Sequence, residues 1–563
     1  MTLNELKSLI GQIVADTLGN DSDPGRLDVS YAPDAKFGDF ATNAAMVYAK
    51  DLKRPPREVA EQLVAALTSG LSGVQDIQIA GPGFINLTLG DKAMIELAES
   101  APKAKHMGYK DQVIVTEYSD PNPFKVLHAG HIYTSVVGAA ISNLFEQAGG
   151  EVHRVNFGGD VGLHVGKTMW AILKELGGEY PDKLADVPAG GRSEWMAKCY
   201  VAGTAAYEDD EAAKAEITKL NKRVYDLFAE HDHESAFAQV YWTCRKWSYD
   251  YFDAFYERIG TPFEKYYPES ETAPTGLKTV QEQLDKGVYK KSDGAVVFEG
   301  EPYGLHTRVF INSNGLPTYE AKDVGLSIRK WEDYHYDKSV IITGNDIIEY
   351  MKVVLKSIEQ FEPKLAERTV HLTHGNVKLA GGVKMSSRKG NFLRAVDVLE
   401  AAAGASKTAT GRDDEQVVLG AVKYSFLKQR MGADIIFDPK ESVSLEGNSG
   451  PYLQYAHARA RSILAKAGEA QAKAGSDLEA DERTLARKIA EYPDVVARAT
   501  DELMPHHICT YLYELAQVFN RFYEANRVVG DARESMRLRL VGLYADVLRD
   551  GLTILGISAP ERL

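Results

Sequence analysis

The chain has 563 residues, of which 44% are hydrophobic, with 65 Lys and Arg against 80 Asp and Glu. This composition is ordinary for a soluble globular protein, and no apolar run approaches the ~18–20 residues that a membrane helix needs. The length favours three or four domains, and the net charge of −15 argues against a nucleic-acid partner held by bulk charge. Any contact with RNA must therefore depend on local patches, on stacking or on shape.

Residues 1–108 are expected to form a small α+β domain. Apolar residues at helical spacing predict helices over residues 3–18 and 57–67. The first of these contains acidic residues and no charged segment followed by an apolar core, so we interpret it as a folded helix of a cytoplasmic protein. The stretch IQIAGPGFINLTLG alternates, which places Phe84 and Asn86 on one face of a strand, opposite its apolar face.

Residues 109–440 change to alternating strands and helices. VIVTEYS predicts a buried strand, HIYTSVVGAAISNLFEQAGG a helix, and EVHRVNF the next strand. This order within about 45 residues predicts an α/β fold with a doubly wound, Rossmann-like parallel sheet. A helical insertion is expected at about residues 175–260, and strands are expected to return at AVVFEG, RVFI and SVIITG.

The last part, residues 441–563, is expected to be an all-α bundle, in which Leu512, Leu515, Phe519 and Phe522 make one apolar stripe. It carries 15 Lys and Arg against 18 Asp and Glu, so it is not a basic tail. The cysteines are far apart and unpaired in spacing, which favours buried thiols over a zinc site or a disulfide framework. They are Cys199, Cys244 and Cys509.

The first candidate site is the motif HAGH, His128 to His131, between a predicted strand and a predicted helix. Free amides at a helix N-terminus attract phosphate. Two imidazoles around the small Gly130 can also approach a triphosphate and stabilise charge on its α-phosphate. The alternative is a pair of surface histidines at a helix start; the strand-to-helix setting favours the phosphate site.

The second candidate site is VKMSSRKG, residues 383–390, which carries Lys384, Arg388 and Lys389 beside two serines. A cationic loop of this kind suits closing over a diphosphate leaving group. Its alternative interpretation is a solvated basic turn.

Together the two motifs resemble the signature motifs of class I aminoacyl-tRNA synthetases, in the same order and about 250 residues apart. More specifically, they resemble the arginyl enzymes: TEYSDPNPFKVLHAGH is similar to that family's extended first motif and KMSSRKG to its form of the second. Further similar segments are NFGGDVG, PESE, SNGLPTYEAKDVG, GPYLQYAHARARSIL, GISAPERL and, near the N-terminus, FGDFATNAAM and GPGFINL. The resemblance covers nearly the whole chain. It implies an N-terminal tRNA-binding domain, a class I catalytic domain and a C-terminal anticodon-binding bundle.

The resemblance implies specific roles around the two motifs. The catalytic residues would be His128, His131, Lys125, Lys384, Lys389 and Arg388. ATP would also contact Gly130, Met385, Ser386 and Ser387.

An arginine pocket is implied by the same resemblance. Glu117 would accept the guanidinium, and Asn122, with Ser119 nearby, would hold the main-chain groups of the amino acid. Tyr319 and Asp323 would complete the pocket, and Asp346 is assigned to it as well. Spacing supports one pair independently, because positions i and i+4 share a helix face and carboxylates can bind guanidinium through two hydrogen bonds. The alternative for that pair is an ordinary surface contact.

For tRNA, the resemblance places the D-loop on the N-terminal domain and the anticodon on the C-terminal bundle. RNA loops are read by stacking bases on aromatic rings and by bonding their edges, which suits Phe84 and Asn86. The candidates in the bundle are Tyr455, Tyr523, Asn526 and Arg527. The alternative in both places is packing. The aromatic run at residues 241–260 is expected to be core, and HDH at 231–233 a solvated turn rather than a metal site.

The implied reaction has two steps. The arginine carboxylate attacks the α-phosphate of ATP with Mg²⁺ assistance, giving arginyl-adenylate and diphosphate, and the 3′-terminal ribose of tRNA(Arg) then takes the arginyl group. No structural metal and no membrane partner are expected, and the resemblance favours a monomer.

Some positions depart from the family pattern. Asp120 stands where serine is common, His164 where glutamine is common, and GNDIIEY lacks two adjacent histidines. The roles of Asp160, His164 and Asp346 are therefore left open. Two rival interpretations remain. A class I synthetase for another amino acid, such as cysteine, is disfavoured by the missing zinc-ligand cysteines and by Glu117. An inactive paralogue that only binds tRNA is disfavoured by the intact motif residues His128, His131, Lys384 and Lys389.

Overall fold

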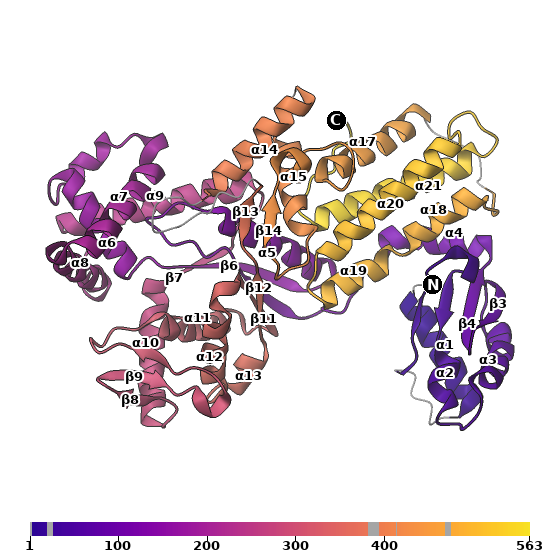
Figure 1. The fold of residues 1–563 in the computed structure, drawn as a ribbon, viewed down its shortest axis with the longest axis horizontal. Helices are drawn as coiled ribbons and strands as arrows, with labels where there is room; N and C mark the ends of the chain where they lie inside the picture. The colour runs from indigo at the N-terminus through magenta and orange to yellow at the C-terminus, as the bar shows by residue number, and fades with distance from the viewer. Residues whose placement is uncertain (1–2, 20–25, 381–392, 412–413, 468–474) are drawn as a thin grey trace. The chain divides into compact units, whose positions relative to one another are not determined.

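The computed structural model describes residues 3–19, 26–380, 393–411, 414–467 and 475–563. The chain forms two compact units, drawn in Figure 1. The terminal unit combines Met1–Met107 with Leu445–Leu563, and the central unit is Gly108–Ser444. Within the described residues, none of the helices combines the length and the apolar character needed to cross a lipid bilayer.

The N-terminal part of the terminal unit is a four-stranded antiparallel sheet covered by helices. Its elements are α1 (Leu3–Leu18), β1 (Val29–Tyr31), η2 (Ala35–Phe37), β2 (Phe40–Thr42), α2 (Ala44–Ala49), α3 (Pro56–Gly70), β3 (Val74–Ala80), β4 (Phe84–Leu89), α4 (Asp91–Ser100) and η3 (Ala101–Lys103). The strand order is β1-β2-β4-β3. Burial alternates along β4, with Ile85 and Leu87 buried, Phe84 42% exposed and Asn86 half-buried. The predicted two-faced strand is confirmed.

The C-terminal part of the terminal unit is helical. It consists of α17 (Gly450–Ala467), α18 (Ala480–Ala490), α19 (Tyr492–Asp501), α20 (His506–Ala525) and α21 (Glu534–Ile554). The predicted apolar stripe is confirmed: Leu512, Leu515, Phe519 and Phe522 are all buried on α20. Figure 1 shows α20 beside α21, where Phe519 stacks on Tyr544 with ring centroids 3.9 Å apart.

Helix α18 joins the two parts of the terminal unit. The Arg483 guanidinium donates to Asp39 at 2.6 Å, to Asp91 at 2.7 Å and to the Leu89 carbonyl at 2.9 Å. Asp39 also accepts from the Leu89 amide at 2.8 Å. The partly buried Arg483 guanidinium therefore fixes the end of β4, the strand that carries Phe84, to the helical part.

The centre of the central unit is a five-stranded parallel sheet. Its strands are β5 (Val113–Glu117), β6 (Glu151–Gly158), β7 (Lys265–Pro268), β11 (Lys338–Gly344) and β12 (Thr369–His374). Their order is β12-β11-β5-β6-β7, and all neighbours are parallel. From β5 the chain adds β6 and β7 on one side and then β11 and β12 on the other, so the strand order reverses between β5 and β11. In open α/β sheets, ligands bind outside the carboxyl ends of the strands at this reversal. The predicted doubly wound sheet is confirmed.

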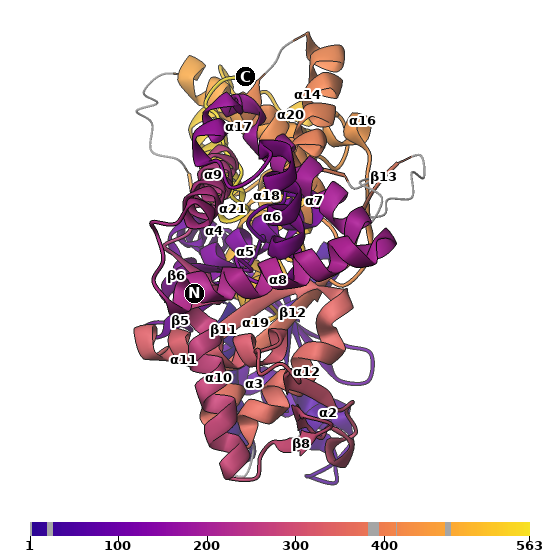
Figure 2. The same cartoon turned by 90° about the vertical axis from the view of Figure 1, so that its left-hand side faces the viewer.

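Helices follow β5 and β6. They are α5 (Ala129–Gln147), α6 (Leu163–Leu176), η4 (Pro181–Asp186), η5 (Ala189–Gly191), α7 (Arg192–Asp209), α8 (Glu211–Ala229) and α9 (Ala236–Arg258). Figure 2 shows α6, α7 and α8 packed against one another. The aromatic run of α9 is core as predicted, because Tyr241, Cys244 and Phe252 are buried. Cys199 and Cys509 are buried as well, which confirms the expectation for the thiols.

The rest of the central unit surrounds the sheet. It comprises α10 (Glu269–Asp285), β8 (Lys290–Ser292), β9 (Ala295–Phe298), η6 (Glu301–Tyr303), β10 (Arg308–Ile311), α11 (Tyr319–Tyr334), η7 (Asn345–Ile347), α12 (Ile348–Glu359), α13 (Pro363–Glu367), β13 (Val377–Leu379), α14 (Ala395–Thr410), α15 (Glu415–Leu427), β14 (Ile435–Phe437) and α16 (Pro439–Ser442). The strands expected at AVVFEG and RVFI exist, but they form a separate antiparallel sheet with β8 and do not join the parallel one. Helices α10 and α11 pack closely because both have glycine at the contact: a Cβ at Gly276 would lie 1.8 Å from the Ala321 carbonyl oxygen.

Candidate active site

The HAGH motif forms the N-terminal end of α5, with His128 as its N-cap. The Nδ1 atom of His128 accepts from the Gly130 amide at 3.1 Å, and Nδ1 of His131 accepts from the His128 amide at 3.0 Å. The rings stack with centroids 3.7 Å apart. Because both Nδ1 atoms accept hydrogen bonds, each neutral ring carries its proton on Nε2. A Cβ at Gly130 would lie 2.9 Å from the His128 ring, so this position favours glycine.

Electrostatics keep this histidine pair neutral. Loss of hydration among the surrounding atoms, and then the nearby Lys125 ammonium, lower the pKa of His128 to about 4. Burial, followed by His128 and Lys125, lowers the pKa of His131 well below its usual range. The charge of Asp346 opposes this lowering of the His128 pKa but does not overcome it, and it has the same effect on His374 of β12. The motif thus offers two uncharged N–H donors at a helix N-terminus, beside a lysine.

Backbone pairing brings a distant segment to the same motif. Ala129 donates to the Leu393 carbonyl at 2.8 Å, and Ala395 donates to the Leu127 carbonyl at 2.9 Å. These contacts fix the chain that directly follows residues 381–392 against the first motif. The second-motif residues fall within 381–392 and lie outside the described residues: Lys384, Met385, Ser386, Ser387, Arg388 and Lys389.

A cluster of three carboxylates lies at the carboxyl end of β5: Glu117 is buried, and Asp120 and Asp323 are partly buried. Glu117, the last residue of this strand, is 3% exposed and pairs with the ammonium of Lys330 from α11. Lys330 also donates to the Ser339 hydroxyl at 3.2 Å. Burial, followed by Glu117, raises the pKa of Asp120 well above its usual range. The pairing of Glu117 with a buried lysine was not foreseen from the sequence.

Asp323 is the carboxylate of this cluster that lacks a cation. It lies one turn after Tyr319 on α11, as the spacing predicts, and accepts a hydrogen bond from the Tyr350 hydroxyl. Among the described residues, no lysine, arginine or histidine forms an ion pair with it; Lys330 pairs with Glu117 instead. Burial, opposed by the Tyr350 hydrogen bond and reinforced by the charge of Glu117, raises the pKa of Asp323 to about 8. A cation bound beside Asp323 would therefore stabilise the charged form of this carboxylate.

The loop after β5 is held in an uncommon backbone conformation. Ser119 and Asp120 have φ values of 75° and 50°. Such conformations cost of order 1–3 kcal/mol and cluster at functional sites. The loop is fixed by side-chain contacts: Ser119 Oγ lies 2.7 Å from the Tyr256 hydroxyl, and Asn122 Oδ1 accepts from the Gly159 amide at 2.8 Å. Since its oxygen is used, the Asn122 amide presents its N–H donors.

Asp160 and His164 have structural partners. The fully buried Asp160 carboxylate accepts from Arg245 of α9 at 2.9 Å and from the Ser270 hydroxyl at 2.7 Å. His164 Nε2 donates to the Gly159 carbonyl at 2.7 Å, because a carbonyl oxygen can only accept. Burial lowers the pKa of His164 and keeps its ring neutral. Both residues therefore shape the turn after β6.

The remaining arginine-pocket candidates lie apart from the buried cluster's centre. Tyr319 is 54% exposed at the start of α11, with its ring 5.1 Å from the Lys322 ammonium. Lys322 itself pairs with the buried Glu269 at 2.5 Å. Asp346 is exposed, and its electrostatic neighbours are the histidines rather than Asp323. Its assignment to the arginine pocket stays a prediction.

The tRNA candidates lie in the terminal unit. Phe84 and Asn86 are on the outward face of β4, and Tyr455 is 48% exposed on α17. The other three candidates line one groove of about 550 Å³, together with Arg459 and Lys466. They are Tyr523, Asn526 and Arg527.

Sequence reasoning missed Lys330, Tyr350 and Arg459. Lys330 lies seven residues after Asp323, on the same face of α11, which is a usable signal. Nothing in the local pattern names its partner, because Glu117 is 213 residues away. Tyr350 and Arg459 likewise act through tertiary contacts.

Comparison with known proteins places this geometry in a family. Residues 95–438 match the family described as tRNA synthetases class I (R), catalytic domain, residues 4–89 the arginyl tRNA synthetase N terminal domain, and residues 453–563 the DALR anticodon binding domain. Proteins named arginine–tRNA ligase are similar over the whole chain. The one from Phocaeicola vulgatus is 29% identical, covering 100% of this chain and 98% of its own, and the one from Bacteroides thetaiotaomicron is 28% identical with the same coverage.

Solved structures agree. The arginyl-tRNA synthetase of Thermus thermophilus superposes with a TM-score of 0.81 at 25% identity, covering 100% of both chains. That of Plasmodium falciparum gives a TM-score of 0.75 at 21% identity, also over 100% of both chains, which shows the shared fold. The chain belongs to the class I arginyl-tRNA synthetase family.

Proposed function

We propose that the chain activates arginine with ATP and transfers it to the 3′-terminal ribose of tRNA(Arg). The observation that carries this proposal is the histidine pair at the start of α5. Both rings are neutral with Nδ1 occupied, so both Nε2–H groups are left to donate at the sheet's reversal point. A helix N-terminus adds its own amides for an anionic group.

In the first step, the arginine carboxylate attacks the α-phosphate of ATP, and diphosphate leaves. His128 and His131 donate to the phosphate oxygens as negative charge builds up, and Lys125 adds a positive charge beside them. Each such donor typically contributes ~10²–10³ in rate. Mg²⁺ would enter with the phosphates, which supply oxygen ligands; among the described residues, no group of three or more His, Cys, Asp and Glu is arranged to hold a metal.

The buried carboxylates would select arginine. Asp323 lacks a cation in the structure, and the guanidinium would supply one through two parallel hydrogen bonds. Glu117 is already neutralised by Lys330, so it contributes to the pocket's field together with that partner. Asn122 would donate to the arginine carboxylate, with Ser119 and Tyr319 at the edges of the pocket.

In the terminal unit, β4 would meet the D-loop of the tRNA through Phe84 and Asn86. The groove that contains Tyr523 would take anticodon bases, with Tyr455 on the same helix face as the groove residue Arg459. The buried apolar face of α1, with Leu6, Ile10 and Val14, supports a folded N-terminal helix. Location in the cytoplasm and a monomeric state are proposed from the family resemblance alone.

The test is ATP–diphosphate exchange with each amino acid, with and without tRNA, and aminoacylation of tRNA(Arg). Arginine should be the preferred substrate. Lysine should not be activated, because its compact ammonium cannot make the two parallel hydrogen bonds that a planar guanidinium makes with a carboxylate. Citrulline keeps the shape and loses the charge, and a site built to bond a polar group can reject such an analogue by roughly 10⁴–10⁵. Glu117→Gln and Asp323→Asn should both reduce the preference for arginine over citrulline. Preference for another amino acid would refute the arginine assignment, and binding of tRNA without any exchange would indicate an inactive paralogue.

A further inference from the structure

The groove in the terminal unit is a local positive site on an acidic protein. It lies between α17 and the segment that follows α20, and none of the described residues lining it is acidic. Its lining includes the cations Arg459, Lys466 and Arg527, while the chain as a whole has a net charge of −15. The Arg459 guanidinium lies 4.5 Å from the centre of the Tyr523 ring. An aromatic ring beside an arginine, in a groove that holds further cations, suits a stacked nucleobase with its phosphate nearby.

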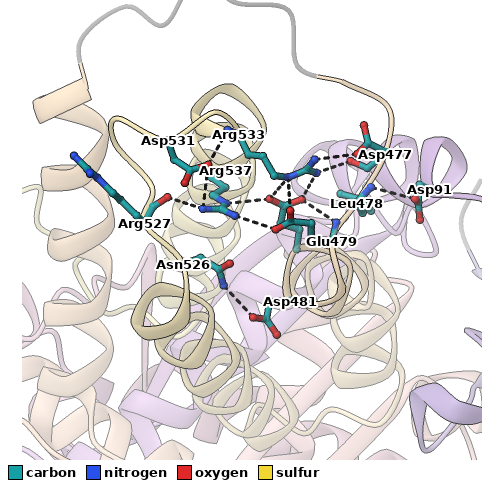
Figure 3. A network of polar contacts seen from close by, with 11 residues as sticks. Asp91, Asp477, Leu478, Glu479, Asp481, Asn526, Arg527, Asp531, Arg533 and Arg537 are labelled. Carbon is teal, nitrogen blue, oxygen red and sulfur yellow. Dashed lines mark hydrogen bonds and ion pairs between the residues drawn. The ribbon is translucent and has the colours of Figure 1, made fainter.

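The side-chain amide of Asn526 has a fixed orientation in this groove. Its Nδ2 donates to the Asp481 carboxylate at 3.0 Å and to the Phe522 carbonyl at 2.9 Å. Both partners can only accept hydrogen bonds, so the nitrogen must face them. Figure 3 shows Asn526 pointing toward Asp481 at the start of α18. Because both Nδ2 hydrogens are used, the polar group that Asn526 can offer to a ligand is its carbonyl oxygen.

The next groove residue is fixed from the same helix end. Arg537 donates to the Arg527 carbonyl at 2.7 Å and to the Glu479 carboxylate at 3.0 Å. It also donates to Glu482, which is 0% exposed and accepts from Arg533 as well. Figure 3 shows this cluster around Arg537. The first turn of α18 therefore holds Asn526 through Asp481 and the backbone of Arg527 through Glu482 and Arg537.

We propose that Asp481 is a positioning residue that makes the groove select a base whose Watson–Crick edge carries an amine at C4 or C6, that is, cytosine or adenine. On that edge such a base donates its amine to the Asn526 oxygen and presents a ring nitrogen acceptor beside the amine. Uracil and guanine present a carbonyl oxygen at the position of the amine, which would face the Asn526 oxygen without a proton between them. Rotating the amide would accommodate them, but it would break the hydrogen bonds of the Asn526 nitrogen to both Asp481 and the Phe522 carbonyl, and the Asp481 contact is the one made to a charged side chain. The inference rests on the proposed function, since it assumes that an unpaired stretch of tRNA enters this groove.

The experiment measures binding of the full chain to full-length tRNA(Arg) transcripts by filter binding. Each cytidine in the anticodon loop is replaced in turn by uridine, and each adenosine by inosine, so that the amine becomes a carbonyl and the neighbouring ring nitrogen changes from an acceptor to a donor. One position should lose about tenfold or more in affinity with the wild-type chain, as a base-specific contact does. Asp481→Ala should reduce that discrimination to about threefold or less, and Asp481→Asn, which keeps an acceptor, should retain most of it.

Asp546→Asn is the matched control, because it removes the same charge from a carboxylate of α21 that pairs with Arg549 at 3.1 Å. Removing any acidic group favours RNA binding through charge alone, so relaxed base selection at unchanged or tighter overall affinity separates positioning from electrostatics. Asn526→Ala should also lose the discrimination, and adding Asp481→Ala to it should change nothing further. Thermal unfolding confirms that each variant is folded.

The inference is overturned if Asp481→Ala keeps the wild-type discrimination at every loop position, or if no substitution affects the wild type. It is also overturned if Asp481→Ala and Asn526→Ala have additive effects. Failure of the proposed function is a different result: the wild-type chain would then not attach arginine to the unsubstituted transcript.

Discussion

Raising the pH from about 6 to about 8 should strengthen arginine binding about fiftyfold, because a guanidinium needs Asp323 in its charged form. Burial raises the pKa of this carboxyl to about 8, so it is protonated in most unliganded molecules at pH 7. The charged fraction is then about one in eleven, which weakens the apparent affinity about tenfold, or about 1.4 kcal/mol. The sign follows from the raised pKa: the binding-competent form gains population as pH rises toward 8.

The assay is isothermal titration of the enzyme with arginine over this pH range, in buffers of different ionisation enthalpy. At pH 7 each bound arginine should release about 0.9 proton. The histidines of the first motif are neutral throughout, because the pKa of His128 is about 4 and that of His131 is also lowered. Asp323→Asn is the control: it should bind arginine weakly and without pH dependence.

Two results would refute this reasoning. A flat wild-type profile between pH 6 and 8 would mean that Asp323 is already charged or does not meet the guanidinium. A slope that persists in Asp323→Asn would assign the titration to another group, and Asp120, whose pKa is also raised, would be the first candidate.

Three further changes have defined outcomes. His128→Ala should lower the rate of single-turnover adenylation by ~10²–10³ with little change in ATP affinity; an unchanged rate would remove His128 from the catalytic group. Phe84→Ala should raise KM for tRNA about 5- to 150-fold, the equivalent of roughly 1–3 kcal/mol of lost stacking, while the KM values for arginine and ATP stay the same. Overlaid tRNA titration curves from a folded variant would make Phe84 a packing residue only. Lys330→Met should cost about 3–5 kcal/mol in urea unfolding because it leaves Glu117 buried without a counter-ion. The matched change Lys265→Met, at a half-exposed pair, should cost at most about 1 kcal/mol, and equal losses in the two variants would contradict that difference in burial.

Local periodicity was enough to predict several site positions. The two-residue repeat put Phe84 on the outward face of its strand, and the strand-to-helix transition put His128 at a helix start. Helical spacing likewise put Tyr319 and Asp323 on one face of α11. Each of these depends on a few neighbouring residues, whose geometry the backbone repeat determines.

Partners from distant segments were not predictable in this way. The sequence predicted that Glu117 accepts the guanidinium of arginine, but it did not predict that Lys330 pairs with Glu117 in the fold. AVVFEG and RVFI read as strands, but periodicity does not say which sheet a strand joins, and they form a small antiparallel sheet of their own. Such pairings depend on tertiary packing, which the local sequence pattern does not predict.

The junction between Arg483 and Asp39 has a consequence for how the protein is made. The two residues are 444 positions apart. At about 5–20 residues added per second, a ribosome would produce Arg483 about 20–90 s after Asp39. The N-terminal sheet thus emerges first but gains the helix that holds the end of β4 only near the close of translation, after the whole central unit has been synthesised. A nascent chain stalled before α18 would carry a complete parallel sheet and an N-terminal sheet still lacking its helical partner, which leaves the end of β4 open to chaperones and proteases during synthesis.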